Sequence, residues 1–375
     1  MGASPYYPDR VYIDKKALDF PLTERILGHL DGLPREIVTS PRRKQTILEA
    51  VRGSEDPAGE GKKILYLTVQ RGLFVKPCPC TPRVVGCGYF IINLHLQCPL
   101  DCTYCILQHY LAEPWLTVFV NLEDLWRELD DFLKKHQRRF IRIGTGELGD
   151  SLALDHFTGL SADLISYFRG KANVCFELKT KTSGIGNLPT VQMRDNIVVS
   201  WSLNAGKIAG EEESGAPPAI ERLQAARAVV KRGYRVGFHF DPLVRFPGWE
   251  REYEEVVRKL FQVIPASSIA WLSLGALRFP PALKKIIQAR FPATKIIYDE
   301  FILGRDGKLR YFKPLRLELL RSVAGFVKKW GGEEIPLYLC MEGEEIWRDV
   351  LTWKPGGKRA VENTLSPRSW GQNKG

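Results

Sequence analysis

The sequence has few cysteines and methionines and no long hydrophobic run. Eight Cys and three Met occur among 375 residues. Eight Cys are too sparse for a disulfide framework in a chain of this length, so we interpret them as metal ligands, reactive thiols or core side chains. No run of about 18 apolar residues is present, which excludes a membrane-spanning helix. The N-terminus lacks the apolar segment of a secretory signal, so we expect a cytoplasmic protein with reduced thiols.

The composition excludes a disordered chain, and the charge is unevenly distributed. Hydrophobic residues make up 44% and charged residues 26%, which is typical of a folded protein. The formal net charge is +11. Residues 78–264 carry 22 basic and 22 acidic side chains, whereas residues 265–375 carry 19 and 11. The basic excess therefore lies mostly at the C-terminal end, which favours a polyanionic partner for that part of the chain.

Strand and helix patterns alternate from residue 89 onward. Six apolar, β-prone segments are each followed by a helical pattern, which predicts a parallel sheet with helical crossovers. We expect a partial (β/α)6 TIM-like barrel, with a doubly wound open sheet as the alternative. The predicted strands cover residues 89–96, 140–144, 172–178, 197–203, 234–240 and 269–277.

The flanking regions do not follow this alternation. The first 76 residues are rich in Pro and Gly and predict irregular structure, apart from one strand at 64–69. Beyond residue 295, an Asp-Gly turn predicts a hairpin. A helix at 315–330, a strand at 337–341 and a helix around 344–351 follow. We expect an N-terminal extension (1–84), a barrel (85–295), a C-terminal hairpin and helical segment (296–352) and a polar tail (353–375).

Three cysteines follow the first barrel strand closely. Cys98, Cys102 and Cys105 have C-x3-C-x2-C spacing. Each thiolate can bind one iron of a [4Fe–4S] cluster, and the fourth iron stays open for a chelating ligand. The amino and carboxylate groups of S-adenosylmethionine form such a chelate, and reductive cleavage then releases a 5′-deoxyadenosyl radical. A zinc site is the alternative, although zinc prefers four ligands.

The wider pattern resembles the spore photoproduct lyase family of radical S-adenosylmethionine enzymes. The resemblance covers roughly residues 85–350. It rests on the Cys motif with Gln108, on Lys179-Thr-Lys181-Thr, and on Ser200-Trp-Ser202-Leu-Asn204. It implies a partial barrel of the radical S-adenosylmethionine type, with the cluster at the open strand ends and radical repair of a thymine dimer in DNA. It also implies an electron donor, such as a flavodoxin or ferredoxin.

The resemblance implies a set of further site residues. Tyr104 matches an aromatic residue near the cofactor that takes part in radical return. Contacts to the cofactor are implied for Gly144, Thr145, Gly146, Glu147, Lys181, Ser202 and Asn204. Three of these, Glu147, Lys181 and Ser202, also end predicted strands, where barrel enzymes carry their chemistry.

Two departures from the family pattern concern the hydrogen chemistry. The lyases have a second Tyr where this chain has Ile106. They also carry a hydrogen-donor Cys at the end of the second strand, where this chain has Glu147, and no Cys lies between residues 106 and 174. We therefore expect a lyase-like relative that lacks this donor. The alternatives are a radical enzyme acting on tRNA, a peptide or a small metabolite, or a non-catalytic iron–sulfur protein that binds nucleic acid.

Other chemistry-bearing residues lie outside this motif. Cys78, Cys80 and Cys87 fall within ten residues and predict either a second metal or cluster site or locally packed thiols. Cys340 is interpreted as a core residue or a hydrogen donor. His239 and Asp241 end a predicted strand and predict either ligand contacts or a loop cap. We expect Glu211, Glu212 and Glu213 to form a solvated acidic loop.

The C-terminal hairpin combines basic and aromatic residues. Arg305, Lys308, Arg310 and Tyr311 are candidates for contacts with DNA phosphates or bases. The alternative is a basic hairpin that only faces solvent.

Overall fold

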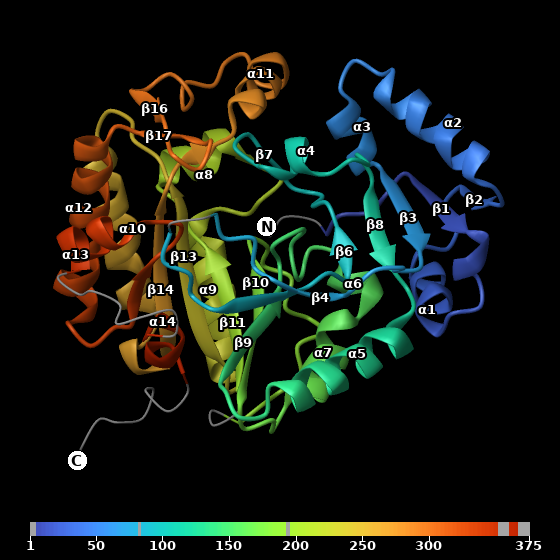
Figure 1. Cartoon of the computed structure of the whole chain (residues 1–375), viewed down its shortest axis with the longest axis horizontal. Helices are drawn as coiled ribbons and strands as arrows, with labels where there is room; N and C mark the ends of the chain where they lie inside the picture. The colour runs from blue at the N-terminus through green and yellow to red at the C-terminus, as the bar shows by residue number, and fades with distance from the viewer. Residues whose placement is uncertain (1–4, 82–83, 193–195, 352–359, 367–375) are drawn as a thin grey trace.

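The chain folds around two largely parallel sheets that lie side by side (Figure 1). The computed structural model describes residues 5–81, 84–192, 196–351 and 360–366. The larger sheet has eight strands in the order β18-β14-β13-β11-β10-β9-β5-β4, and a smaller sheet has five in the order β2-β1-β3-β8-β6. No helix within these described ranges has both the length and the apolar character needed to cross a bilayer.

The larger sheet curls into a half-barrel and confirms the predicted partial barrel (Figure 1). Its six central strands are parallel to their neighbours. They are β5 (Tyr89–Ile92), β9 (Ile141–Thr145), β10 (Val174–Thr180), β11 (Ile197–Ser202), β13 (Arg235–Leu243) and β14 (Ile269–Ala276). Two further strands extend the sheet: β18 (Leu337–Leu339) lies parallel to β14, and β4 (Val75–Pro77) lies antiparallel to β5.

Helices cover the outer face of the half-barrel. Packing contacts join α7 to β10, α9 to β11 and β13, α12 to β14, and α5 to β4. The crossover helices are α5 (Leu122–Lys135), α6 (Asp155–Thr158), α7 (Leu160–Phe168), α9 (Ala219–Lys231), α10 (Trp249–Val263) and α11 (Pro281–Arg290). Helix α5 buries one apolar face, with Leu122, Leu125 and Leu129 in the core.

The prediction of an irregular N-terminal region is wrong. Residues 10–68 form an α/β unit with three parallel strands (Figure 1). Its elements are β1 (Arg10–Asp14), α1 (Pro21–His29), β2 (Arg35–Val38), α2 (Pro41–Arg52), α3 (Pro57–Lys62) and β3 (Ile64–Thr68). The prolines that resembled loop signals open the helices instead, since each helix has Pro at its first position.

The two sheets interleave along the chain. After β5, the chain returns to the small sheet through β6 (His95–Leu96) and β8 (Leu116–Phe119) before it enters α5. The segment between β6 and β8 therefore lies where the two sheets adjoin, and it contains the C-x3-C-x2-C motif.

The C-terminal region confirms the predicted hairpin and helices. The hairpin joins β16 (Phe301–Leu303) to β17 (Leu309–Tyr311), and β17 also pairs with β15 (Arg278–Phe279). The long helix α12 (Lys313–Gly331) and α13 (Glu344–Leu351) follow, and α14 (Ala360–Thr364) lies in the predicted polar tail. Residues 352–359 and 367–375 of that tail lie outside the described residues.

Candidate functional site

The three cysteines of the motif lie on a loop at the carboxyl edge of the half-barrel. We call residues 98–105 the cysteine loop. Within it, β7 (Asp101–Cys102) pairs antiparallel with β12 (Glu213–Ser214), with Cys102 opposite Glu213. Because β12 follows β11 and the short helix α8 (Gly206–Glu212), this pairing joins the loop to the open strand ends. Cys102 is buried, and Cys98 and Cys105 are half-buried.

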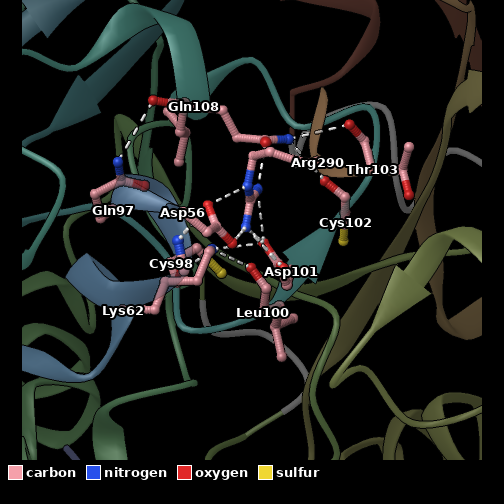
Figure 2. Close-up of polar contacts among 12 residues, drawn as sticks. Asp56, Lys62, Gln97, Cys98, Leu100, Asp101, Cys102, Thr103, Gln108 and Arg290 are labelled. Atoms are coloured by element: carbon pink, nitrogen blue, oxygen red, sulfur yellow. Dashed lines mark hydrogen bonds and ion pairs between the residues drawn. The ribbon is translucent and has the colours of Figure 1, made fainter. Parts of the chain in front are cut away.

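Two side chains from outside this loop, Lys62 and Gln108, hold its backbone (Figure 2). Lys62 Nζ donates to the Cys98 carbonyl at 2.7 Å and to the Leu100 carbonyl at 2.5 Å. Gln108 Nε2 donates to the carbonyls of Cys102 and Thr103 at 3.2 and 3.0 Å. The loop conformation is thus fixed through its carbonyl groups, and its sulfur atoms remain available.

The donor set suits an iron–sulfur cluster. Burial raises the pKa of the Cys98 thiol well above its ordinary value, and it raises the pKa of Cys102 to about 12. The Cys105 amide donates to the Cys102 carbonyl at 3.0 Å, so these two cysteines share one tight turn of the loop. Throughout the described part of the chain, no three His, Cys, Asp or Glu side chains converge on one metal ion. A cluster does not need that convergence, because each cysteine binds a different iron.

A buried carboxylate, Glu213, organises the residues beside this loop. The Tyr104 hydroxyl donates to Glu213, and Arg222 Nη2 lies 2.5 Å from Glu213 Oε2. Asn204 Nδ2 donates to Glu213 Oε1 at 3.3 Å, and Lys181 Nζ lies 4.0 Å away. Glu213 therefore joins three of the predicted site residues.

The expectation of a solvated acidic loop at residues 211–213 is wrong for two of its three members. Glu212 and Glu213 are only 5% and 2% exposed, whereas Glu211 faces solvent. A run of three Glu resembles a surface loop in sequence. The register of β12 against β7 turns Glu213 inward, where Arg222 compensates its charge. No local pattern could have shown this.

The end of β9 carries the second group of predicted residues. Gly144 has no room for a side chain, because an added Cβ would lie 2.1 Å from the Glu177 carbonyl oxygen and 2.3 Å from the Tyr89 hydroxyl. Gly146 has a φ of +96°, which favours glycine. Thr145 is buried and shares a hydrogen bond of 2.6 Å with Ser151. Glu147 follows the turn and forms an ion pair with Lys179 of β10.

The ends of β10 and β11 supply the remaining predicted residues. The Lys181 amide donates to Asp150 Oδ2 at 2.7 Å, and its side chain is 15% exposed. The carbonyl of Ser202 accepts a 2.9 Å hydrogen bond from Arg222. A cavity of about 320 Å³ adjoins this edge and is lined by residues of the cysteine loop and of the loop after β10, including Pro99, Leu100, Thr182 and Ser183.

A polar network fills the barrel interior below this edge. His239 Nε2 lies 2.8 Å from Glu177 Oε1, and its Nδ1 lies 2.6 Å from Ser273 Oγ. Burial alone would raise the pKa of Glu177, but interaction with His239 and other nearby positive charges lowers it overall. Asp241 instead forms an ion pair of 2.9 Å with Arg278. The sequence singled out His239 and Asp241 but gave no indication of these partners.

The second cysteine group lies close to Glu147. The Cys80 amide donates to the Cys78 carbonyl at 2.7 Å, so the two residues share one tight turn. Interaction with the Cys78 thiol and the positive charges of Arg278 and Lys308 lower the pKa of Cys80 to about 7. The negative charge of Glu147 contributes to raising the pKa of Cys78. Cys340, which the sequence analysis considered as a hydrogen donor, has its sulfur 3.6 Å from Arg278 Nη2.

Two of the four hairpin residues predicted to contact DNA face the protein interior. Arg310 is 7% exposed and forms an ion pair of 2.5 Å with Asp306, and it also lies 3.8 Å from Glu342. Tyr311 is fully buried, and its hydroxyl accepts a hydrogen bond from the Arg245 amide. Within the hairpin sheet, Arg310 pairs with Arg278 of β15, and Tyr311 pairs with Phe301 of β16. Arg305 remains exposed, and Lys308 is half-buried.

Comparison with known proteins gives one consistent result. The spore photoproduct lyase family profile matches residues 6–315. Spore photoproduct lyases of Clostridium acetobutylicum and Geobacillus sp. are 25% and 26% identical over 80% and 82% of this chain, and the matches cover 89% and 90% of those proteins.

Solved structures show the same fold. A spore photoproduct lyase complexed with the dinucleoside spore photoproduct superposes with a TM-score of 0.75 at 24% identity, covering 90% of this chain and 99% of that one. A doubly substituted lyase with bound AdoMet and the same dinucleoside gives the same values. Since the family profile spans most of the sequence, the chain belongs to the spore photoproduct lyase family of enzymes.

Proposed function

We propose that the chain binds a [4Fe–4S] cluster through Cys98, Cys102 and Cys105, cleaves S-adenosylmethionine reductively, and acts on a pyrimidine lesion in DNA. The observation that carries this proposal is the cysteine loop itself, with three thiols at the carboxyl edge of the half-barrel and its backbone held by the β7–β12 pairing, Lys62 and Gln108. When bound, the cluster supplies one electron to the sulfonium of the cofactor.

The surrounding residues suit a zwitterionic cofactor. Glu147 and Lys179 present one charge of each sign beside the β9 turn, and Lys181 with Glu213 does so beside the cysteine loop. We assign the cofactor-binding role to Gly144, Thr145, Gly146, Glu147, Lys181, Ser202 and Asn204. Tyr104 donates its hydroxyl hydrogen to Glu213, which orients the ring beside the loop.

The substrate radical must receive a hydrogen atom from a donor. Because Glu147 occupies the position of the family's donor Cys, another residue must supply this hydrogen. We assign this role to the Cys78–Cys80 pair: the Cys78 amide bonds to the Tyr89 carbonyl of β5, which pairs with β9, and the raised pKa of Cys78 keeps its thiol hydrogen in place. In this step the thiol S–H bond breaks, the substrate C–H bond forms, and the sulfur is left one electron short. The same flavodoxin or ferredoxin that reduces the cluster restores it with one electron and one proton.

Two assays on anaerobically reconstituted protein test this proposal. Formation of 5′-deoxyadenosine from S-adenosylmethionine and dithionite is expected, and a purely binding protein would form none. Deuterium from a labelled thymine dimer is then expected in 5′-deoxyadenosine. Cleavage without deuterium transfer would mean that the substrate is another molecule, such as tRNA, a peptide or a small metabolite.

A variant pair tests the donor. Cys80→Ala and Cys78→Ala should each lower the yield of repaired product while 5′-deoxyadenosine formation continues, whereas Cys340→Ala should behave like the native protein. The assignment is wrong if Cys340→Ala alone shows the loss.

The contact with DNA is proposed for Arg305 and Lys308, the two hairpin cations that remain accessible. Reversing both charges should make the DNA association constant less dependent on salt. The slope of its logarithm against the logarithm of salt concentration should fall in magnitude by about one for each lost phosphate contact. Lys328→Glu on α12 is the matched control, and an unchanged slope for the double variant would remove the hairpin from the interface.

A further inference from the structure

Lys62 is a buried cation at the end of α3, in the N-terminal α/β unit. The residue is 8% exposed, and it lies 36 positions before Cys98 in the sequence. Lysine is rarely buried unless its charge and its hydrogens find partners. Among the described residues, the polar partners of its ammonium group all belong to the cysteine loop. They are the carbonyls of Cys98 and Leu100, and Asp101 Oδ1 at 3.6 Å (Figure 2).

The position of Lys62 is fixed by close packing around α3. An added Cβ on Gly61 would lie 2.3 Å from the Pro114 carbonyl oxygen, so the helix end approaches the chain after the cysteine loop as closely as the backbone allows. The carbonyl of Lys62 accepts a hydrogen bond from the Tyr6 hydroxyl. The side chain therefore reaches the cysteine loop from a rigid support.

A second cation, Arg290 at the end of α11, ties the same helix to the same loop. Its guanidinium is bidentate to Asp56, the N-cap of α3, at 2.7 and 2.9 Å. It also contacts Asp101 Oδ2 at 3.0 Å and donates to Gln108, whose amide holds the Cys102 and Thr103 carbonyls (Figure 2). Both ends of α3 are thus connected to the cysteine loop.

We propose that Lys62 is a positioning residue for the iron–sulfur site: it holds the loop conformation in which the three sulfurs meet the cluster, and it supplies a buried positive charge next to them. This inference rests on the proposed function. It assigns the N-terminal α/β unit a direct part in the cofactor site, although none of its residues is a ligand.

Three variants of the full chain test the proposal. Lys62→Met keeps the length and apolar stem of the side chain and removes both charge and donors. Lys62→Gln removes the charge and keeps an N–H donor on a side chain that is one atom shorter. Lys63→Met is the matched control, because Lys63 is exposed and pairs only with Glu60 on its own helix.

The first readout is the cluster. Loss of a group that orients metal ligands typically lowers metal affinity by about 10–100-fold. We expect Lys62→Met to release iron to a chelator at least about tenfold faster than the native protein. We expect its remaining cluster to show a more negative midpoint potential. Lys62→Gln should release iron more slowly than Lys62→Met and show a potential shift of the same sign, and Lys63→Met should match the native protein.

The second readout is hydrogen exchange in the cluster-free protein. Lys62→Met should speed exchange of the amides of residues 98–103 and leave those of β9 and β10 unchanged. If the native protein binds no [4Fe–4S] cluster, the proposed function fails, and this readout still tests the hold of Lys62 on the loop. Equal iron release, equal potential and equal exchange in Lys62→Met and the native protein would overturn the inference. If Lys62→Met does not fold, Lys62→Gln decides it through the potential.

Discussion

The two groups of three cysteines differ in how their loops are held. The cysteine loop of Cys98, Cys102 and Cys105 is fixed by a strand pairing and by side chains from α3 and α4 (Leu107–Tyr110), with Arg290 of α11 linking these two helices. The described residues of the segment of Cys78, Cys80 and Cys87, which are 78–81 and 84–87, are held by backbone hydrogen bonds: the Cys78 amide bonds to the Tyr89 carbonyl, and the Val85 amide bonds to the Glu342 carbonyl. Thr81 reaches Asp306 of the hairpin at 3.3 Å.

This difference separates two kinds of cysteine chemistry. A cluster needs ligands whose relative positions are set before it binds, and the first loop provides that order. A reactive thiol needs access and a lowered pKa, and Cys80 has both, since it is exposed and its pKa is about 7. The same residue type, 18 positions apart in the sequence, thus suits a ligand at Cys98 and a reactive group at Cys80.

The largest expected effect is on iron content. Cys102→Ala should abolish binding of the cluster, whereas Cys80→Ala should retain about four irons per chain after anaerobic reconstitution. The reason is that the first loop lies at the carboxyl edge of the half-barrel, with its backbone held by a strand pairing and by Lys62 and Gln108. Iron and sulfide analysis measures both variants. The comparison breaks if Cys80→Ala loses iron as Cys102→Ala does.

Alkylation of the cluster-free protein should separate the two groups next. The thiolate is the nucleophile, so the reaction rate of Cys80 with iodoacetamide should rise with pH up to about 8 and then level off. Cys102, with a pKa of about 12, should react slowly and still be gaining rate at pH 9. Peptide mass spectrometry over this pH range gives each rate. Similar profiles for the two thiols would contradict the distinction.

The barrel could be predicted from the sequence, and the three cysteines of the motif could be proposed as ligands, because both depend on local patterns. The barrel strands lie in apolar runs that alternate with helical patterns, and the motif spacing is a signature within eight residues. The N-terminal unit was missed because its helices begin with prolines, which resemble loop signals in sequence.

The supports of the site could not be predicted, because they are tertiary contacts. Lys62 meets Leu100 across 38 positions, and Tyr104 meets Glu213 across 109. Arg310 and Tyr311 resemble surface residues in sequence, because a basic hairpin has the same residue pattern whichever way its side chains face. In each case the deciding fact is which element packs against the residue, and no short pattern contains it.

A third prediction concerns the strand pairing that holds the cysteine loop. Glu213→Gln leaves Arg222 buried without its counter-charge, and removing one partner of such a pair typically costs about 3–5 kcal/mol. Urea unfolding should show this loss of stability. Hydrogen exchange should also speed up at residues 101–103 and not at 78–80. Glu211→Gln, two residues away and exposed, is the control and should change neither.

The smallest effect is expected at the support of the second group. Burial alone raises the pKa of Asp306, but the Arg310 guanidinium outweighs it and lowers the pKa to about 2. A carboxylate with a lowered pKa in the folded state stabilises the protein above its unfolded value near 4, and this contribution is lost as pH falls toward 2. Asp306→Asn should therefore cost about 1–2 kcal/mol at pH 7, and the difference from the native protein should shrink below pH 4. Urea unfolding at pH 7 and pH 3 checks this. A stability difference that does not change with pH would mean that the Asp306–Arg310 ion pair is not the cause of the stabilisation.

The same variant should also change the reactivity of the second cysteine group. Because Thr81 of this group contacts Asp306 of the hairpin, alkylation of Cys80 should rise a few-fold in Asp306→Asn, while that of Cys102 stays constant.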